Sequence, residues 1–249
     1  MTLVSHDHRF IFLKTQKTAG TAVEMALEPY CAEPGHQAAH FTDVKVSDHG
    51  IIGARHRGGG VDKTNWYGHQ SAAQVRDMLG EETFDSYTKV ATMRNPFDKM
   101  VSYFHWKRDA SGRILKSESK AETIDTFRRY IRQANRGGAL ERFAQVDRDV
   151  CFVDGELELD RLLRTETMEH DLQSFAQDKR LDTSRLQMQR PKTSARKKDK
   201  IRVPDYYDKK SADIVRKTFD WVFEIGDYSE QPHDAVRATR NLVTLMAAE

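Results

Sequence analysis

The chain has 249 residues and nearly balanced charge, with 40 lysines and arginines against 38 aspartates and glutamates. A net charge of +2 argues against a protein drawn by its overall field to nucleic acid or membranes, so local basic clusters matter more. Two cysteines far apart in the sequence argue against a disulfide framework or a cysteine-based metal site. No stretch approaches the roughly 18 apolar residues of a membrane span, and residues 1–9 lack a targeting core. We therefore expect a single cytoplasmic domain over residues 1–249.

The first strong pattern is a strand, a short loop and a helix in direct succession. The apolar run Phe10–Leu13 predicts a buried strand, and a helical pattern begins after the loop and ends before Pro29. This arrangement aims backbone N–H groups and the positive end of a helix at one point. Lys17 adds a full charge there, and Thr18 and Thr21 add hydroxyl groups. The sequence therefore predicts a phosphate-binding loop, in which the lysine precedes the glycine, unlike the loop of nucleotide hydrolases.

Further elements follow at intervals that suit alternating strands and helices. Residues 51–54 predict a short strand, and 55–68 read as a loop. Ser71 and Gln74 form the pattern of a capping box, which opens a helix that Gly80 ends. The apolar run Tyr87–Met93 predicts the next strand.

A second candidate anion site follows this strand. Arg94 stands at its carboxyl end, where open α/β sheets bind ligands, and Pro96 suits the first turn of a helix. Ser102 lies on that helix and faces the same end if the helix begins at Pro96. An arginine with a neighbouring hydroxyl can hold a second phosphate.

The remaining elements complete an α/β pattern. Asp154 and Gly155 predict a hairpin turn, residues 189–202 form a basic stretch, and helices are expected over 209–223 and from Pro232 to the end. Strands that alternate with helices predict three layers, with a mainly parallel central sheet flanked by helices.

Two motifs resemble the paired signature of sulfotransferases that use 3′-phosphoadenosine 5′-phosphosulfate (PAPS). They are Lys17-Thr-Ala-Gly-Thr-Ala22 and Arg94-Asn-Pro-Phe-Asp-Lys-Met-Val-Ser102-Tyr. The resemblance is to the carbohydrate-type family that includes the heparan sulfate 2-O-sulfotransferases, and it extends from Phe10 to about Tyr228. Many relatives have proline at the position of Gln16 and glycine at that of Ala19. Residues 229–249 read as a helical extension.

The resemblance implies a fold like that of the P-loop nucleotide hydrolases and a role for each motif residue. Those implied to hold the 5′-phosphosulfate are Lys17, Thr18, Ala19, Gly20, Thr21 and Ala22. Those implied to hold the 3′-phosphate are Arg94 and Ser102, and a loop with Lys192, Thr193 and Ser194 would close over the nucleotide. No metal is required.

The implied reaction is an in-line displacement that moves a sulfuryl group to a hydroxyl or amine. Negative charge develops on the departing phosphate oxygen, so we expect Lys17 to stabilise the transition state. The acceptor must lose a proton, and a histidine suits that role. We expect His69, just before a helix, to be the base, with His56 as the second candidate.

Other interpretations remain open. A kinase could use the same strand-loop-helix geometry, and a non-catalytic nucleotide-binding module could retain it. The acceptor is expected to be a carbohydrate or small alcohol, but its identity, O- or N-sulfation and the oligomeric state do not follow from the sequence. We expect no nucleic-acid partner, and interpret the basic stretch 190–202 as a nucleotide-covering loop.

Overall fold

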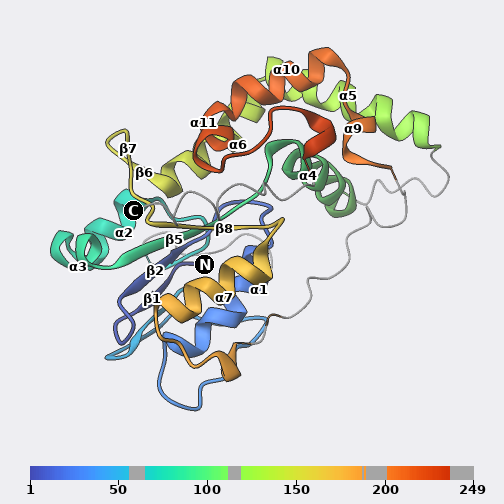
Figure 1. Cartoon of the computed structure of the whole chain (residues 1–249). Helices are drawn as coiled ribbons and strands as arrows, with labels where there is room; N and C mark the ends of the chain where they lie inside the picture. Colours follow the sequence, from blue (N-terminus) through green and yellow to red (C-terminus); the bar gives the residue numbers. More distant parts are fainter. Residues whose placement is uncertain (56–64, 112–118, 187, 189–200, 236–249) are drawn as a thin grey trace, which may run out of the picture. The chain divides into compact units, whose positions relative to one another are not determined.

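The computed structural model describes residues 1–55, 65–111, 119–186, 188 and 201–235 (Figure 1). His56, residues 192–194 and residues 236–249 lie outside this set, so the predictions made for them have no structural counterpart. The chain divides into two compact units. The first unit comprises Met1–Met93 and Gln145–Pro191, and the second comprises Arg94–Ala144 and Lys192–Glu249.

The first unit contains a six-stranded sheet in the order β3-β4-β1-β2-β5-β8. The strands are β1 (Leu3–Ser5), β2 (Phe10–Leu13), β3 (Lys45–Ser47), β4 (Gly50–Ile52), β5 (Thr88–Met93) and β8 (Arg161–Arg164). Strand β5 pairs in parallel with both β2 and β8, whereas the pairs β1–β2, β1–β4 and β3–β4 are antiparallel.

The α/β class is therefore confirmed, but the sheet is mixed rather than mainly parallel. The difference arises at the amino terminus, where β1 folds back on β2 through a short turn with Arg9 in the left-handed region (φ 51°). A turn this short joins only antiparallel strands, because a parallel connection needs a crossover. The parallel part, β2-β5-β8, carries the predicted phosphate-binding loop.

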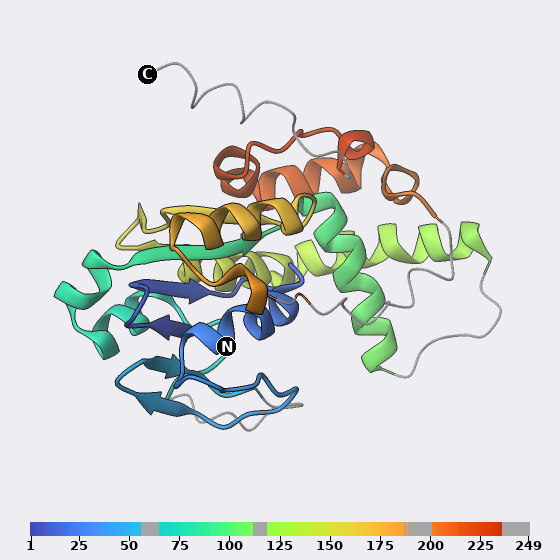
Figure 2. The ribbon, with the colours of Figure 1, turned by 60° about the horizontal axis from the view of Figure 1, so that its bottom comes forward.

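Two helices cover one face of this sheet. Helix α1 (Gly20–Leu27) and helix α7 (Met168–Asp178) lie side by side there (Figures 1 and 2), and the short helix η1 (Glu28–Tyr30) extends α1. Phe10 and Phe12, every second residue of β2, lie on this face and share one buried cluster with Val23 of α1 and Phe175 of α7. Alternation along a strand therefore fixes which face each side chain of β2 occupies.

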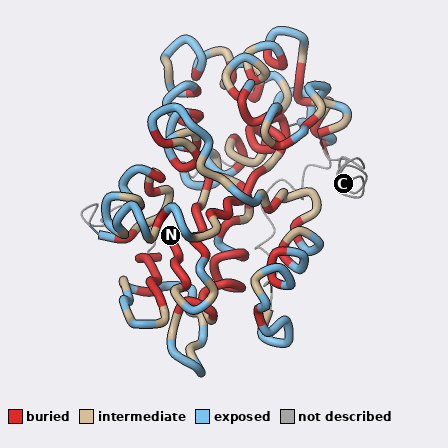
Figure 3. Tube along the Cα trace, turned by 60° about the vertical axis from the view of Figure 1, so that its left-hand side comes forward, coloured by how far each residue is buried: buried red, intermediate tan, exposed pale blue. Residues whose placement is uncertain are grey.

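The opposite face packs against α3 (Glu81–Ser86). Lys89 of β5 places its ammonium 5.5 Å from the centre of the Phe84 ring, while its neighbour Val90 belongs to the cluster on the first face. Helix α2 (Ala72–Leu79) precedes α3 and contacts β6 (Phe152–Val153). Strands β2 and β5 are buried along nearly their whole length, as Figure 3 shows for the sheet.

Several local predictions are confirmed at the expected residues. Ser71 and Gln74 form the capping box of α2, and Gly80 ends that helix with φ 82°. The hairpin turn lies at Asp154 and Gly155, both with positive φ, between β6 and β7 (Glu156–Leu157). Its strands have only two residues each, because Val150 and Cys151 belong to helix α6 (Ala139–Cys151).

The second unit is helical where it is described. Its helices are α4 (Pro96–Ala110), α5 (Lys120–Arg136), the first part of α6, α9 (Val203–Tyr206), α10 (Lys209–Thr218), α11 (Asp220–Ile225) and η3 (Pro232–Asp234). Helix α4 begins at Pro96, as predicted, with the Asn95 side chain accepting from the N–H of Phe97. Phe97 also meets the rings of Tyr207 and Phe223, so aromatic packing forms this unit's core.

The predicted closing helices differ in extent from the observed ones. The helix expected over 209–223 is divided at Phe219 into α10 and α11. The helix expected from Pro232 is a 3₁₀ turn over Pro232–Asp234 in the part that is described. None of the described helices is long and apolar enough to cross a membrane.

Candidate phosphate-binding site

The predicted loop leaves the carboxyl end of β2 and ends at the first turn of α1. Lys17 and Ala19 both adopt left-handed backbone conformations, with φ of 60° and 58°. This conformation costs roughly 1–2 kcal/mol for a residue with a Cβ, and it suits glycine better. The positive φ of Ala19 explains why glycine suits this position in many relatives.

Two threonine hydroxyls hold the loop against the neighbouring strand. Thr15 Oγ1 donates to the carbonyl of Thr92 in β5 at 2.5 Å. Thr18 Oγ1 lies 2.7 Å from Thr92 Oγ1 and donates to the carbonyl of Thr15 at 3.0 Å. Thr15, Thr18 and Thr92 are all buried. The Thr18 hydroxyl therefore fixes the loop's shape from inside.

Two further segments fix the loop from other parts of the first unit. Thr165, which follows β8, donates through Oγ1 to the carbonyls of Thr18 (3.2 Å) and Met93 (2.9 Å). The backbone N–H of Gln16 donates to Asp147 Oδ1 at 2.7 Å. A proline at this position, as in many relatives, has no N–H for such a bond. The carboxylate of Asp147 therefore anchors a loop that departs from the family pattern.

We expect Thr18→Val to lower the free energy of unfolding by about 1–3 kcal/mol, because valine keeps the shape and removes a buried hydroxyl with two partners. Denaturant unfolding followed by circular dichroism measures this difference. The matched control is Thr183→Val, since Thr183 is exposed in η2 (Thr183–Arg185). Equal stability of the two variants would contradict the anchoring role.

Lys14 lies beside the loop and against the start of α1. Its ammonium donates to Thr21 Oγ1 and to Glu24 Oε2, each at 3.0 Å. A Cβ on Gly20 would lie 2.8 Å from Lys14 Cγ, so glycine at this position makes room for the lysine. Burial, together with the positive charges of Arg55 and Lys17, lowers the pKa of Lys14 to about 7.

His69 is placed at the same edge of the sheet. Its Nδ1 lies 2.9 Å from the backbone carbonyl of Lys14, the residue that follows β2. A carbonyl only accepts, so Nδ1 carries the proton and Nε2 carries the lone pair in the neutral ring. His69 has a φ of 60°, a conformation sustained by its surroundings. His69, the predicted base, therefore contacts the backbone just before the predicted loop, within the first unit.

The residues of the second candidate anion site, Arg94 and Ser102, belong to the second unit. Arg94 follows Met93, the last residue of β5, and its Nε and Nη2 lie 2.7 and 2.5 Å from Asp98 Oδ2. Asp98 and Ser102 are four residues apart on α4, so both lie on one face of the helix. Arg94 and Ser102 are partly exposed. Asp98 therefore orients the guanidinium on the helix face that carries the Ser102 hydroxyl.

Arg164, the last residue of β8, contacts Asp171 Oδ2 of α7 through Nε at 3.3 Å. Lys14, Thr15, Thr92, Asp147 and Thr165 were not predicted, and apart from Lys14 no motif marks them. Lys14 could have been found from its position directly after the strand.

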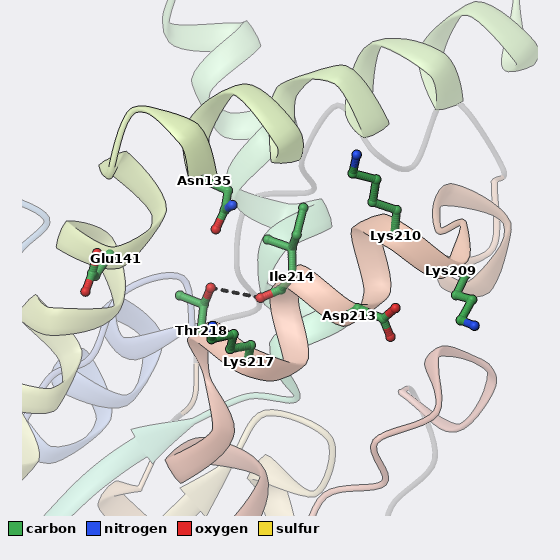
Figure 4. A pocket seen from close by; sticks show the side chains of 8 residues that line it. All are labelled: Asn135, Glu141, Lys209, Lys210, Asp213, Ile214, Lys217 and Thr218. Carbon is green, nitrogen blue, oxygen red and sulfur yellow. Dashed lines mark hydrogen bonds between the residues drawn. The ribbon is translucent and has the colours of Figure 1, made fainter.

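A pocket of about 700 Å³ in the second unit holds none of the predicted site residues (Figure 4). It is lined by α10 with Asn135 of α5 and Glu141 of α6, and carries both signs of charge, from Lys210 and Lys217 to Asp213. Among the described residues, no group of three or more histidine, cysteine, aspartate or glutamate side chains is arranged to hold a metal ion.

The fold and the loop together define a class: an α/β protein with a strand-loop-helix segment, a candidate anion site, at the carboxyl edge of parallel strands. The model of the sulfotransferase family matches residues 1–222. The chain therefore belongs to the sulfotransferase family, whose members transfer sulfuryl groups. Neither a curated protein nor a solved structure matches the chain.

Proposed function

We propose that this protein transfers the sulfuryl group of PAPS to a hydroxyl or amine of a carbohydrate or small alcohol. The observation that carries the proposal is the loop between β2 and α1, which combines Lys17 with a helix N-terminus in a chain of the sulfotransferase family. The family match spans sequence from both units, which supports treating the chain as one functional domain.

The residues present suit the anionic donor. The loop backbone from Lys17 to Ala22 and the Lys17 ammonium are assigned to the 5′-phosphosulfate. Thr18 contributes through its backbone, because its hydroxyl is engaged with Thr15 and Thr92. Arg94 and Ser102 are assigned to the 3′-phosphate, and Lys192, Thr193 and Ser194 to a loop over the nucleotide.

The reaction follows from these assignments. His69 Nε2 accepts the proton of the acceptor hydroxyl as its oxygen forms a bond to sulfur. The bond between sulfur and the bridging oxygen breaks, and its electron pair remains on the 5′-phosphate. Lys17 and the loop N–H groups stabilise the charge that gathers there. The products are the sulfated acceptor and 3′,5′-adenosine bisphosphate, and no step needs a metal ion.

The proposal is tested by transfer from ³⁵S-labelled PAPS to panels of carbohydrates and small alcohols, with EDTA present. Labelled acceptor is the expected product. Magnesium-dependent consumption of ATP, with no affinity for 3′,5′-adenosine bisphosphate, would contradict the proposal and indicate a kinase.

We expect Arg94→Ala to weaken binding of 3′,5′-adenosine bisphosphate about 10- to 100-fold, since charged hydrogen bonds contribute about 1.5–3 kcal/mol. The rate at saturating donor should change much less, because the 3′-phosphate takes no part in bond breaking. Titration calorimetry and donor-dependent kinetics separate the two effects. The control is Lys45→Ala on exposed β3, and an unchanged Kd in Arg94→Ala would remove this assignment.

A further inference from the structure

Lys14 contacts both parts of the proposed catalytic site. Its carbonyl accepts from His69 Nδ1 at 2.9 Å, and its ammonium contacts Thr21 and Glu24 of α1 at 3.0 Å each. The side chain also fills the space that a Cβ on Gly20 would occupy. One residue therefore connects the candidate base with the first turn of the phosphate-binding helix.

The charges around this lysine are unevenly distributed. Glu24 is fully buried and also contacts the Met1 amino group and, at 3.7 Å, the Arg55 guanidinium. Lys14, Lys17 and Arg55 bring three cationic side chains to this region, where Glu24 is bonded to Lys14 and the second buried carboxylate, Glu28, pairs with Arg55 at 2.5 Å. Burial of Lys14, together with the positive charges of Arg55 and Lys17, lowers its pKa to about 7, so both protonation states are populated near neutral pH.

The position of this charge is unfavourable to the dipole of α1, and the contact with Glu24 in the second turn offsets only part of that effect. The first turn of α1 contains no acidic residue, and a cation beside a helix N-terminus opposes the helix dipole. An anion bound at the loop would make the positive charge of Lys14 favourable there, because the anion attracts the protonated lysine. The position of the Lys14 ammonium beside the positive end of α1 therefore favours an anionic ligand at the loop.

We propose that Lys14 is a positioning residue of the donor site: it holds Thr21 and the first turn of α1 in place and takes up a proton from solvent when the anionic donor binds. This inference rests on the proposed function. The direction of the proton change follows from linkage. An anion that binds the protonated lysine more tightly raises the proton affinity of that lysine, so binding above pH 7 is accompanied by proton uptake.

The test is calorimetric titration of 3′,5′-adenosine bisphosphate in buffers of different ionisation enthalpy. At pH 8 a lysine with a pKa of about 7 is mostly neutral, so we expect the wild-type protein to take up protons from solvent when it binds the nucleotide. At pH 6 we expect little uptake. Lys14→Arg, which stays charged, should bind without this uptake, and its affinity should fall less between pH 6 and pH 8.

Two comparisons isolate the effect. The Met1 amino group and His69 are present in both the wild type and Lys14→Arg, and the variant keeps the positive charge that, after burial, lowers the pKa of the Met1 amino group well below its usual value. Lys45→Arg on exposed β3 should match the wild type. Gly20→Ala should weaken binding, because the added Cβ displaces the lysine stem.

The outcomes separate the two proposals. Saturable binding without proton uptake at pH 8 overturns the role of Lys14 and leaves the donor site standing. Equal uptake in the wild type and in Lys14→Arg also overturns it. Absence of bisphosphate binding in the wild type overturns both. Saturable wild-type binding without proton uptake decides against Lys14 even if a variant fails to fold, whereas an observed uptake is assigned to Lys14 by its loss in Lys14→Arg.

Discussion

Replacing Lys17 by alanine is expected to lower kcat by about two to three orders of magnitude, the usual effect of removing one group that stabilises transition-state charge. Lys17 lies in a strained left-handed conformation in the loop between β2 and α1. The sulfuryl donor carries its greatest change of charge at the bridging oxygen. Loss of the ammonium should therefore affect the chemical step more than nucleotide binding.

Steady-state kinetics at saturating PAPS measures this effect, together with calorimetric titration of the bisphosphate. The bisphosphate should still bind to Lys17→Ala, which shows that the site is folded. Lys45→Ala serves as the matched control, because Lys45 is exposed on a strand of the same sheet. A purified Lys17→Ala protein with the wild-type rate would rule out this role.

Replacing His69 by asparagine is expected to lower kcat by about two to four orders of magnitude, the range of a general base. Asparagine is chosen because residue 69 has a φ of 60°, a conformation that asparagine tolerates better than most residues. Its amide can also donate to the carbonyl of Lys14 as Nδ1 does. The variant thus removes the base while it keeps the local backbone.

Rates at saturating donor and acceptor test this prediction, with His170→Asn on the exposed side of α7 as the control. Binding of the bisphosphate should be unchanged in both variants. Wild-type turnover in His69→Asn would place the base elsewhere, and His56 would then be the next histidine to replace.

The strand, loop and helix of the candidate phosphate-binding site could be predicted from sequence because their determinants are contiguous. An apolar run, a lysine, small residues and a helical pattern occupy residues 10–27 without interruption. The side chains that hold the loop could not be predicted, since Thr92, Asp147 and Thr165 come from distant segments. Parallel pairing of β2, β5 and β8 and packing of α6 bring these residues to the loop.

The mixed sheet escaped prediction for a related reason. Strands β1, β3 and β4 have three residues each, too few to show a period of two, and β1 stands next to polar residues. The longer β5, with buried residues along nearly its whole length, was predicted within one residue of its observed start.

We propose that one doubly phosphorylated nucleotide binds this protein through the loop after β2 and through Arg94 with Ser102. The decisive experiment is calorimetric titration of the wild-type protein with 3′,5′-adenosine bisphosphate and with 5′-AMP. We expect saturable binding of one bisphosphate per chain, with 5′-AMP about 10- to 100-fold weaker because it lacks the second phosphate. Absence of saturable binding, or equal affinity for the two nucleotides, would rule out this two-phosphate site.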